Sequence, residues 1–333
     1  NTETAITDIL NPGKYDAYAK HYNIGNASTT FNVNKIPISM SMNIKMIDVD
    51  AVLIKVKLSQ PINASVNLKV NSKSYPLKTI NGIANLTLND LDYGNYSVNA
   101  KFSNAYYEDA NASGKFSVNY VRTHLIADNV TLYYHDGTRF YVSLVDKNNN
   151  PLANENINFT INGRNTTKYT DKEGKCSIAL QLNSGSYPIN ITYFGNGKYL
   201  PDNLTRNVLV KPTIISNDIT KIFRNSTPFT ATILDGKGNP VKNTEISMNI
   251  NGVFYKRNTD SKGVVKLNLN LPQGNYLLTT NNPVTGENAV NNVTIIPSIV
   301  ENNDLVMYYK NGSKYSVKLL GSTGSPLANT NVT

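Results

Sequence analysis

The segment Asn156-Ile-Asn-Phe-Thr-Ile-Asn-Gly163 decides the fold, because its apolar residues occupy every second position. Ile157, Phe159 and Ile161 would share one side of an extended strand, and the polar residues between them would share the other. The segment returns 89 residues later as Glu245-Ile-Ser-Met-Asn-Ile-Asn-Gly252. This alternation predicts a half-buried antiparallel strand, and the Asn-Gly pair that ends both copies predicts a tight hairpin turn.

The repeat extends beyond this strand. The turn Asp146-Lys-Asn-Asn-Asn-Pro151 returns as Asp235-Gly-Lys-Gly-Asn-Pro240 and as Gly321-Ser-Thr-Gly-Ser-Pro326, at offsets of 89 and 86 residues. Asp171-Lys-Glu-Gly174 matches Asp260-Ser-Lys-Gly263 at the first of these offsets. Several landmarks at one spacing indicate a repeated unit of just under 90 residues.

A Gly-x-Tyr corner occurs late in each unit. Leu182-Asn-Ser-Gly-Ser-Tyr187 matches Leu271-Pro-Gln-Gly-Asn-Tyr276, and Leu91–Tyr96 and Leu10–Tyr15 share the pattern. The glycine would make a turn, and the tyrosine would start the next strand with its ring on the core and its hydroxyl free to bond the main chain. This is similar to the tyrosine corner of immunoglobulin-type sandwiches. An aromatic residue that merely starts the strand is the alternative.

About seven short strands per unit, with turns every 8–12 residues, predict an all-β fold of tandem immunoglobulin-like β-sandwich domains in an extended array. The unit at 34–121 is divergent, because it lacks the Asp-x-x-x-x-Pro turn. The expected segments are the C-terminal half of a domain at 1–33, complete domains at 34–121, 122–211 and 212–297, and the N-terminal half of a domain at 298–333.

The two half-domains have two interpretations. The first is that the chain is a window on a longer array of repeats. The second is that each half pairs with strands of neighbouring chains, which would give a fibre by strand complementation.

Composition excludes several classes of protein. Of the 333 residues 40% are apolar, yet none of the apolar runs reaches the roughly 18 residues of a membrane-spanning helix, and no signal leader is visible. One cysteine and three histidines argue against a disulfide scaffold and a His/Cys metal site. The net charge of +9 comes from scattered Lys and Arg, which favours a solvated basic surface over a nucleic-acid groove. Attraction to an anionic cell wall or glycan stays open.

The combination of Asp-x-x-x-x-Pro-(Leu/Val)-x-Asn, Asn-Gly, Asp-x-x-Gly and Leu-x-x-Gly-x-Tyr resembles bacterial Ig-like repeats. It also resembles the adhesin-like surface proteins of methanogenic archaea, and it covers roughly the whole chain. The resemblance implies an extracellular, cell-surface rod or fibre that mediates attachment. We expect its partners to be cell-surface or cell-wall glycans or other copies of itself, and neither nucleic acid nor a membrane span in this segment.

No motif marks a catalytic centre. The sequence has no Gly-x-Ser-x-Gly elbow, phosphate loop or paired-carboxylate motif, and His21, His124 and His135 fall in different units. We therefore expect no enzyme activity, no catalytic residue, no cofactor and no metal. The turns Asp146–Asn150 and Asp235–Asn239 carry oxygen ligands that suit calcium but lack the EF-hand spacing, so turn geometry is favoured.

Two further side-chain reactions bear on function: attack by the cysteine thiol and formation of an isopeptide cross-link. Cys176 belongs to the inward set with Ile178 and Leu180, which predicts a buried, unreactive thiol. An intramolecular Lys–Asn isopeptide cross-link stays open, without a defined triplet of residues.

Fourteen asparagines match the Asn-x-Ser/Thr acceptor pattern of N-glycosylation. An AT-rich coding sequence would raise the number of asparagines, and therefore of such matches, without any glycan. Two of the fourteen flank inward residues of alternating strands and should point outward. The possible sites are Asn26, Asn63, Asn85, Asn95, Asn111, Asn129, Asn158, Asn165, Asn190, Asn203, Asn225, Asn292, Asn311 and Asn331; the outward pair is Asn158 and Asn190.

The sequence is compatible with three functions. The first is a non-catalytic extracellular stalk or fibre that mediates cell-surface attachment. The second is a self-assembling surface filament or coat whose half-domains pair between neighbouring chains. The third is an accessory Ig-like region of a larger cell-wall or carbohydrate-active enzyme.

Overall fold

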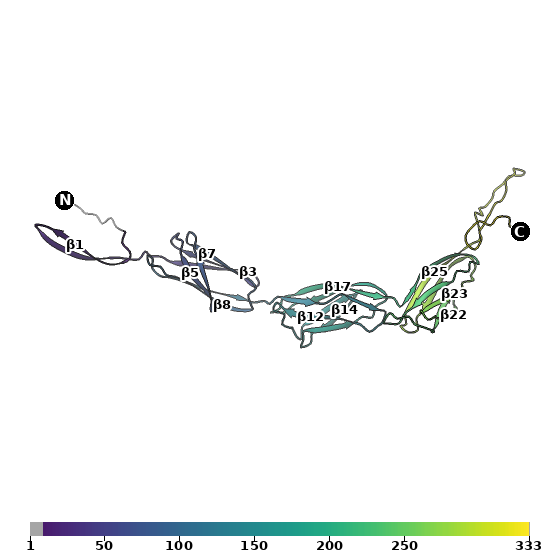
Figure 1. Cartoon of the computed structure of the whole chain (residues 1–333), viewed down its shortest axis with the longest axis horizontal. Coiled ribbons are helices and arrows are strands. Elements are labelled where there is room, and N and C mark those ends of the chain that lie inside the picture. The colour runs from purple at the N-terminus through teal and green to yellow at the C-terminus, as the bar shows by residue number, and fades with distance from the viewer. Residues whose placement is uncertain (1–8, 333) are drawn as a thin grey trace. The chain divides into compact units, whose positions relative to one another are not determined.

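The computed structural model describes residues 9–332 and shows them as strands, turns and loops without a helix (Figure 1). The expected all-β class and the tandem sandwiches are confirmed. Residues 1–8 and 333, which belong to the expected segments at the two ends, lie outside the described residues. The expected domain boundaries themselves stay predictions.

The contacts divide the chain into two compact units. The first unit ends at His124 and includes the loops Asp146–Asn150 and Phe194–Asp202, and the second holds Leu125–Val145, Pro151–Tyr193 and the chain from Asn203 onward. A helix that could cross a lipid bilayer is absent from the part of the chain that the structure describes.

The second and third sandwiches share one topology. In both, a three-stranded sheet faces a five-stranded sheet, and the outermost strand of the larger sheet pairs parallel with its neighbour. The order β10-β12-β15 with β11-β17-β16-β13-β14 recurs as β18-β20-β23 with β19-β25-β24-β21-β22. This division corresponds to the A-B-E and C-F-G sheets of an immunoglobulin sandwich.

The strands of these two sandwiches have the following bounds. The second sandwich comprises β10 (Thr123–Ile126), β11 (Val130–Tyr133), β12 (Arg139–Asp146), β13 (Asn156–Ile161), β14 (Arg164–Tyr169), β15 (Lys175–Ala179), β16 (Gly185–Tyr193) and β17 (Asp202–Lys211). The third comprises β18 (Ile214–Ser216), β19 (Ile219–Ile222), β20 (Phe229–Ile233), β21 (Glu245–Ile250), β22 (Val253–Asn258), β23 (Val264–Leu267), β24 (Gly274–Asn281) and β25 (Asn288–Ile296).

The first sandwich has the same two layers without the parallel outer strand. Its sheets have the orders β3-β4-β7 and β6-β5-β8-β9. The strands are β3 (Met40–Asp48), β4 (Ala51–Leu58), β5 (Ser65–Val70), β6 (Lys73–Lys78), β7 (Ile83–Leu88), β8 (Gly94–Phe102) and β9 (Ala110–Val118). The divergence seen in the sequence therefore changes one edge of the sandwich and leaves its core order intact.

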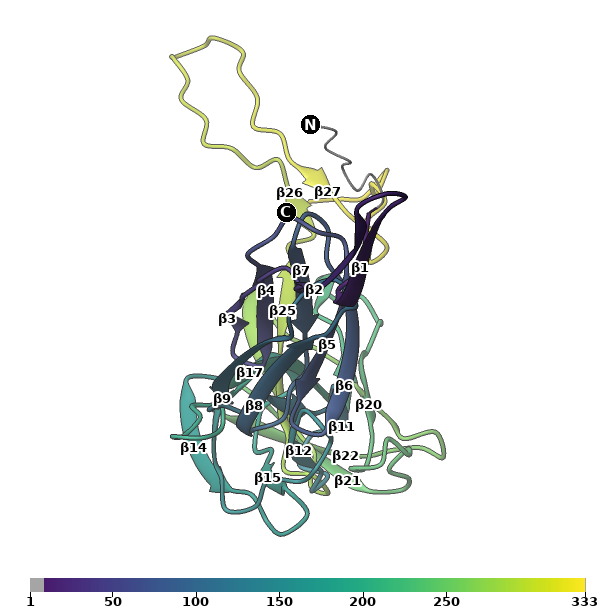
Figure 2. The same cartoon turned by 90° about the vertical axis from the view of Figure 1, so that its left-hand side faces the viewer.

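Two further pairings, both labelled in Figure 2, form two-stranded sheets of their own. β1 (Gly13–His21) and β2 (Gly25–Val33) form an antiparallel hairpin, which matches β8–β9 in carrying a Gly-x-Tyr corner at its start. β26 (Ile299–Val300) pairs antiparallel with β27 (Lys318–Leu319), as β18 pairs with β20.

Alternation along the strands separates core from solvent. In β4, Val52, Ile54 and Val56 are fully buried, and in β13 Ile157 and Phe159 are fully buried. Since successive side chains of a strand point to opposite faces, the residues between them are left half-buried or exposed. The period-two pattern therefore predicts the core residues of these strands correctly.

All four Leu-x-x-Gly-x-Tyr sequences form the tyrosine corner. Each tyrosine hydroxyl donates a hydrogen bond to the main-chain carbonyl four residues earlier, over 2.7–3.0 Å. The pairs are Tyr15 with Asn11, Tyr96 with Asp92, Tyr187 with Asn183, and Tyr276 with Pro272. The hydrogen bond ties the loop between the two sheets to the strand that follows it, so the aromatic residue does more than start a strand.

The Asn-Gly pairs adopt the expected positive φ angles. Asn162 and Gly163 lie at 48° and 72° in the turn between β13 and β14, and Asn251 and Gly252 lie at 50° and 80° between β21 and β22. Two successive positive φ angles define the type I′ turn, whose twist suits a two-residue hairpin. In the first sandwich the hairpin β5–β6 instead has Asn71 at 50°.

The Asp-x-x-x-x-Pro turns bond their own main chain. Asp235 Oδ1 accepts the amides of Lys237 and Asn239, both at 2.8 Å, and these bonds, the Asn239 amide first, lower the pKa of Asp235. Asp146 accepts the amides of Asn148 and Asn150 in the same way. The aspartate oxygens thus serve the turn, as turn geometry requires.

The turn at Asp146–Asn150 also contacts the first sandwich within the first compact unit. Lys147 Nζ donates to the carbonyls of Asp90 and Leu91, each at 2.6 Å, and lies 3.3 Å from the carboxylate of Asp92. Hydrogen bonds from Asn148 and Lys147 lower the pKa of Asp92. A motif that the sequence presents as a local turn is therefore also hydrogen-bonded to the loop that precedes β8.

Replacing Tyr187 by Phe removes the corner hydrogen bond and keeps the ring in the core. We expect the second sandwich to lose about 1 kcal/mol of unfolding free energy, the usual net value of one hydrogen bond. Urea unfolding measures this loss. The matched control is Tyr169→Phe on the exposed strand β14 of the same sandwich, which should change the midpoint little; equal effects of the two substitutions would contradict a stabilising corner.

Candidate functional site

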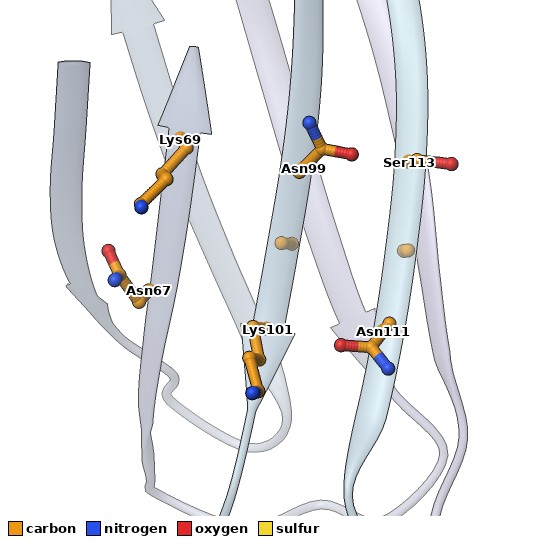
Figure 3. A pocket seen from close by; sticks show the side chains of 8 residues that line it. Asn67, Lys69, Asn99, Lys101, Asn111 and Ser113 are labelled. Atoms are coloured by element: carbon orange, nitrogen blue, oxygen red, sulfur yellow. The ribbon is translucent and has the colours of Figure 1, made fainter. Parts of the chain in front are cut away.

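The outer face of the four-stranded sheet in the first sandwich carries a group of exposed polar side chains. Its strands β5, β8 and β9 each bury one set of alternating residues and direct the other set to solvent. The outward residues form what we call the Lys–Asn face: Asn67, Lys69, Asn99, Lys101, Asn111, Ser113 and Lys115. Figure 3 shows the first six on three adjacent strands.

The strand register arranges these side chains in rows. Asn67 pairs with Lys101, which pairs with Asn111 on the next strand. Lys69 pairs with Asn99, which pairs with Ser113. The rows line an open depression of about 550 Å³, and the backbone at Ala100 and Ala112 completes its lining. Lysine and amide groups therefore alternate across the depression.

The charge of the sheet has one sign. The four strands β5, β6, β8 and β9 contain no Asp or Glu. The nearest acidic residues in sequence lie in loops: Glu108 and Asp109 precede β9, and Asp92 precedes β8. The ion pairs formed by Arg122, Lys147, Lys256 and Lys318 lie elsewhere and do not include Lys69, Lys101 or Lys115. The ammonium groups of the face are thus available to an anion.

Equivalent side chains of the other sandwiches bond one another. In the second sandwich Thr205 donates to Asn190 over 2.9 Å, and in the third Asn281 donates to Asn288 over 3.0 Å. The register makes Asn99 and Ser113 the counterparts of the first pair, and Lys101 and Asn111 those of the second. In the first sandwich these four side chains form no such bond within the described residues, so their donors and acceptors face solvent unpaired.

The three lysines are specific to the first sandwich. Position by position, Lys69 corresponds to Thr160 and Asn249, and Lys101 to Thr192 and Asn281. Lys115 corresponds to Asn207 and Asn292. The main-chain amides of these two residues donate equivalent hydrogen bonds to the side chains of Asn129 and Asp218. The cationic character of the face is therefore a property of one repeat and not of the repeat motif.

The asparagines of the glycosylation pattern lie mostly on the surface, spread over the three sandwiches and the outer pairings. Twelve of the fourteen are exposed, including Asn190, while Asn158 and Asn225 are half-buried. The fold brings few of them together: Asn111 lies in the Lys–Asn face, and Asn95 lines the adjoining depression with Lys115 and Ser117.

Two of these asparagines use the nitrogen that would carry a glycan. Asn225 Nδ2 donates to the carbonyl of Ser322 at 2.5 Å, and Asn292 Nδ2 donates to Asp218 at 2.9 Å. A glycan on either nitrogen would replace one of its two hydrogens and place a bulky group beside the acceptor of that hydrogen bond.

Residues considered for chemistry are not gathered into a reactive centre. His21 lies in β1, His124 in β10, and His135 in the turn after β11, where its ring stacks on Tyr134. Within residues 9–332, no group of three His, Cys, Asp or Glu side chains is placed to hold a metal ion. Buried Lys221 donates to the carbonyls of Thr227 and Leu269, and desolvation lowers its pKa.

Cys176 is less deeply buried than the sequence predicted. It is half-buried, whereas Val265, its counterpart in the third sandwich, is fully buried. Burial nevertheless raises the pKa of its thiol to about 11, with a smaller contribution from Asp171. The thiol is thus protonated at neutral pH, which suits a packing role better than a nucleophilic one.

The sequence analysis expected about seven short strands in each unit but did not identify the Lys–Asn face. The signal was present as Asn67-x-Lys69 and Asn99-x-Lys101, where polar residues alternate with apolar ones. Only the register between strands that are 32 residues apart shows that Lys69 and Lys101 are neighbours. Such an arrangement of amides and ammonium groups can bind a ligand.

No family model matches the chain. In sequence it is similar to the inverse autotransporter adhesin YeeJ of Escherichia coli (strain K12), with 22% identity over 280 residues. The alignment covers 74% of this chain and 12% of the adhesin, so the chain spans about an eighth of that relative's length.

Two solved structures are similar at low TM-scores. Invasin, a bacterial integrin-binding protein, is 14% identical, with 79% of this chain and 61% of that chain covered and a TM-score of 0.30. The FN1–FN3 domains of chicken CNTN1 are 10% identical, with 78% and 99% covered and a TM-score of 0.27. Structural similarity this weak is not evidence for the fold, which is assigned from the strand order instead.

We expect the folded chain to resist alkylation at Cys176. At pH 9 a thiol with a pKa of about 11 has a thiolate population about fiftyfold lower than an unfolded one with a pKa of 9.0, which is half ionised there. Iodoacetamide labelling should therefore be correspondingly slower in the native chain than in urea.

The control carries Cys176→Val together with Thr166→Cys, which moves the thiol to the exposed strand β14. This thiol should react at nearly the unfolded rate. Native labelling of Cys176 as fast as that of the control would contradict a protonated packing thiol.

Proposed function

We propose that the chain is part of a non-catalytic, extracellular repeat protein of the adhesin class, which attaches a cell surface to a polymer or to another cell. The observation that carries this proposal is the sequence similarity to an adhesin, which extends over 74% of the chain. Membership of the bacterial Ig-like repeats and kinship with archaeal adhesin-like surface proteins belong to the same proposal.

The repeats support attachment because a chain of repeats can be extended and because several repeats can contact one surface. Each sandwich closes its own core, so repeats can be added in series without a new fold. Weak contacts made by several repeats on one surface raise the effective concentration for each further contact. The partners proposed are cell-surface or cell-wall glycans, with other copies of this chain as the second candidate.

Beads coated with the whole chain test this function. We expect them to adhere to surfaces coated with cell-wall polysaccharide and to remain dispersed from one another, whereas beads coated with an unrelated sandwich protein should not adhere. Clumping of the beads without surface adhesion would support the self-assembling coat instead. Release of soluble sugar from the polysaccharide would contradict a non-catalytic role.

N-glycosylation of the exposed asparagines is a further part of the proposal. For chain produced in its native host, the intact mass should exceed the 36.7 kDa of the sequence by whole glycan units. Peptide mapping should place these glycans on exposed sites and leave Asn225 and Asn292 unmodified, because their Nδ2 groups are donated elsewhere. A mass equal to that of the sequence would contradict occupancy.

A further inference from the structure

We propose that the Lys–Asn face of the first sandwich is a binding site for an acidic polysaccharide, a polymer that carries carboxylates along a hydroxyl-rich chain. The inference rests on the proposed adhesin function and names the ligand class and the repeat that binds it. It follows from the geometry of the face, its charge and the unpaired state of its side chains.

The charge selects an anion. Lys69 and Lys101 occupy diagonal positions on adjacent strands, where side chains lie about 7–8 Å apart. Lys115 extends the cationic surface along β9, and the four strands contribute no carboxylate. Repeated carboxylates on one polymer chain can therefore each contact an ammonium group while the protein supplies no competing anion.

The amides select a sugar over a bare polyanion. An asparagine side chain offers both donors and an acceptor, which matches the hydroxyl groups of a saccharide. Asn67 and Asn111 flank Lys101 in one row, and Asn99 lies beside Lys69 in the other. Each cation thus has an amide neighbour that can bond a hydroxyl close to the carboxylate.

The absence of stacking groups points the same way. Among the outward residues of β5, β8 and β9 there is no aromatic side chain. A neutral glycan would then depend on exposed hydrogen bonds alone, which compete with water. Charge on the ligand supplies the attraction that this flat surface needs.

The contrast with the other sandwiches makes the face distinct. At equivalent positions, Asn190 bonds Thr205 in the second sandwich and Asn281 bonds Asn288 in the third, in each case across two strands. Those side chains satisfy themselves, whereas Asn99, Lys101 and Ser113 keep their hydrogen-bonding groups for a ligand. The same comparison supplies substitutions that the fold tolerates at these positions.

The test uses the whole chain from a host without N-glycosylation, so that Asn95 and Asn111 carry no glycan. Binding is measured by calorimetry with polygalacturonate oligomers, with neutral dextran of similar length and with polyphosphate. We expect binding to polygalacturonate that weakens as salt increases, weaker binding to polyphosphate, and none to dextran. Equal binding of polygalacturonate and dextran, or of polygalacturonate and polyphosphate, would overturn the proposal.

The face variant combines Lys69→Thr, Lys101→Thr and Lys115→Asn, the residues of the second sandwich. Loss of three exposed ion pairs should weaken polygalacturonate binding about tenfold or more. The control variant Lys45→Thr, Lys55→Thr and Lys57→Thr removes three exposed lysines from the strands β3 and β4 of the same sandwich. It changes the net charge equally and should bind as the unmodified chain does.

A second variant separates sugar recognition from charge. Asn67→Ala with Asn99→Ala leaves every lysine in place and should weaken binding of polygalacturonate but not of polyphosphate. Unfolding midpoints of all variants confirm that each is folded. If the face variant binds polygalacturonate normally while coated beads still adhere, this inference is wrong and the adhesin function stands; if the beads fail to adhere to any surface, the function itself is wrong.

Discussion

The pleat of the β-strand is the constraint on which the rest of this structure depends. Successive side chains point to opposite faces, so a strand that buries Val66 and Leu68 must direct Asn67 and Lys69 to water. The inner set closes the core, and the outer set is free of packing demands. One local rule thus produces both the stable sandwich and the surface on which a ligand can bind.

A second constraint on each repeat is the connection between its two sheets. The tyrosine corner holds the loop before β8, β16 and β24 by a hydrogen bond from a side chain whose ring packs on the core. Because the corner is built from a glycine, a tyrosine and a carbonyl four residues earlier, it needs few fixed residues. The remaining positions of each repeat are therefore able to change while the sandwich is kept.

The outward positions show what that freedom allows. In the second and third sandwiches Thr and Asn side chains bond across strands, which adds to the sheet but leaves little for a partner. In the first, lysines replace three of them and the neighbouring amides lose their cross-strand bonds. At these positions the sheet of the first sandwich thus lacks cross-strand hydrogen bonds between side chains, and the same side chains can bind a ligand instead.

The sequence by itself determined the strands, the buried set, the type I′ turns and the corners, because each depends on residues within a few positions of one another. Val52, Ile54 and Val56 could be assigned to the core from their spacing alone. Only the tertiary structure decided which strands pair, that β11 and β19 run parallel to their neighbours, and that Lys147 reaches the carbonyls of Asp90 and Leu91. It also decided the rows of the Lys–Asn face, since the register between distant strands is set by packing of the whole sandwich and leaves no local pattern in the chain.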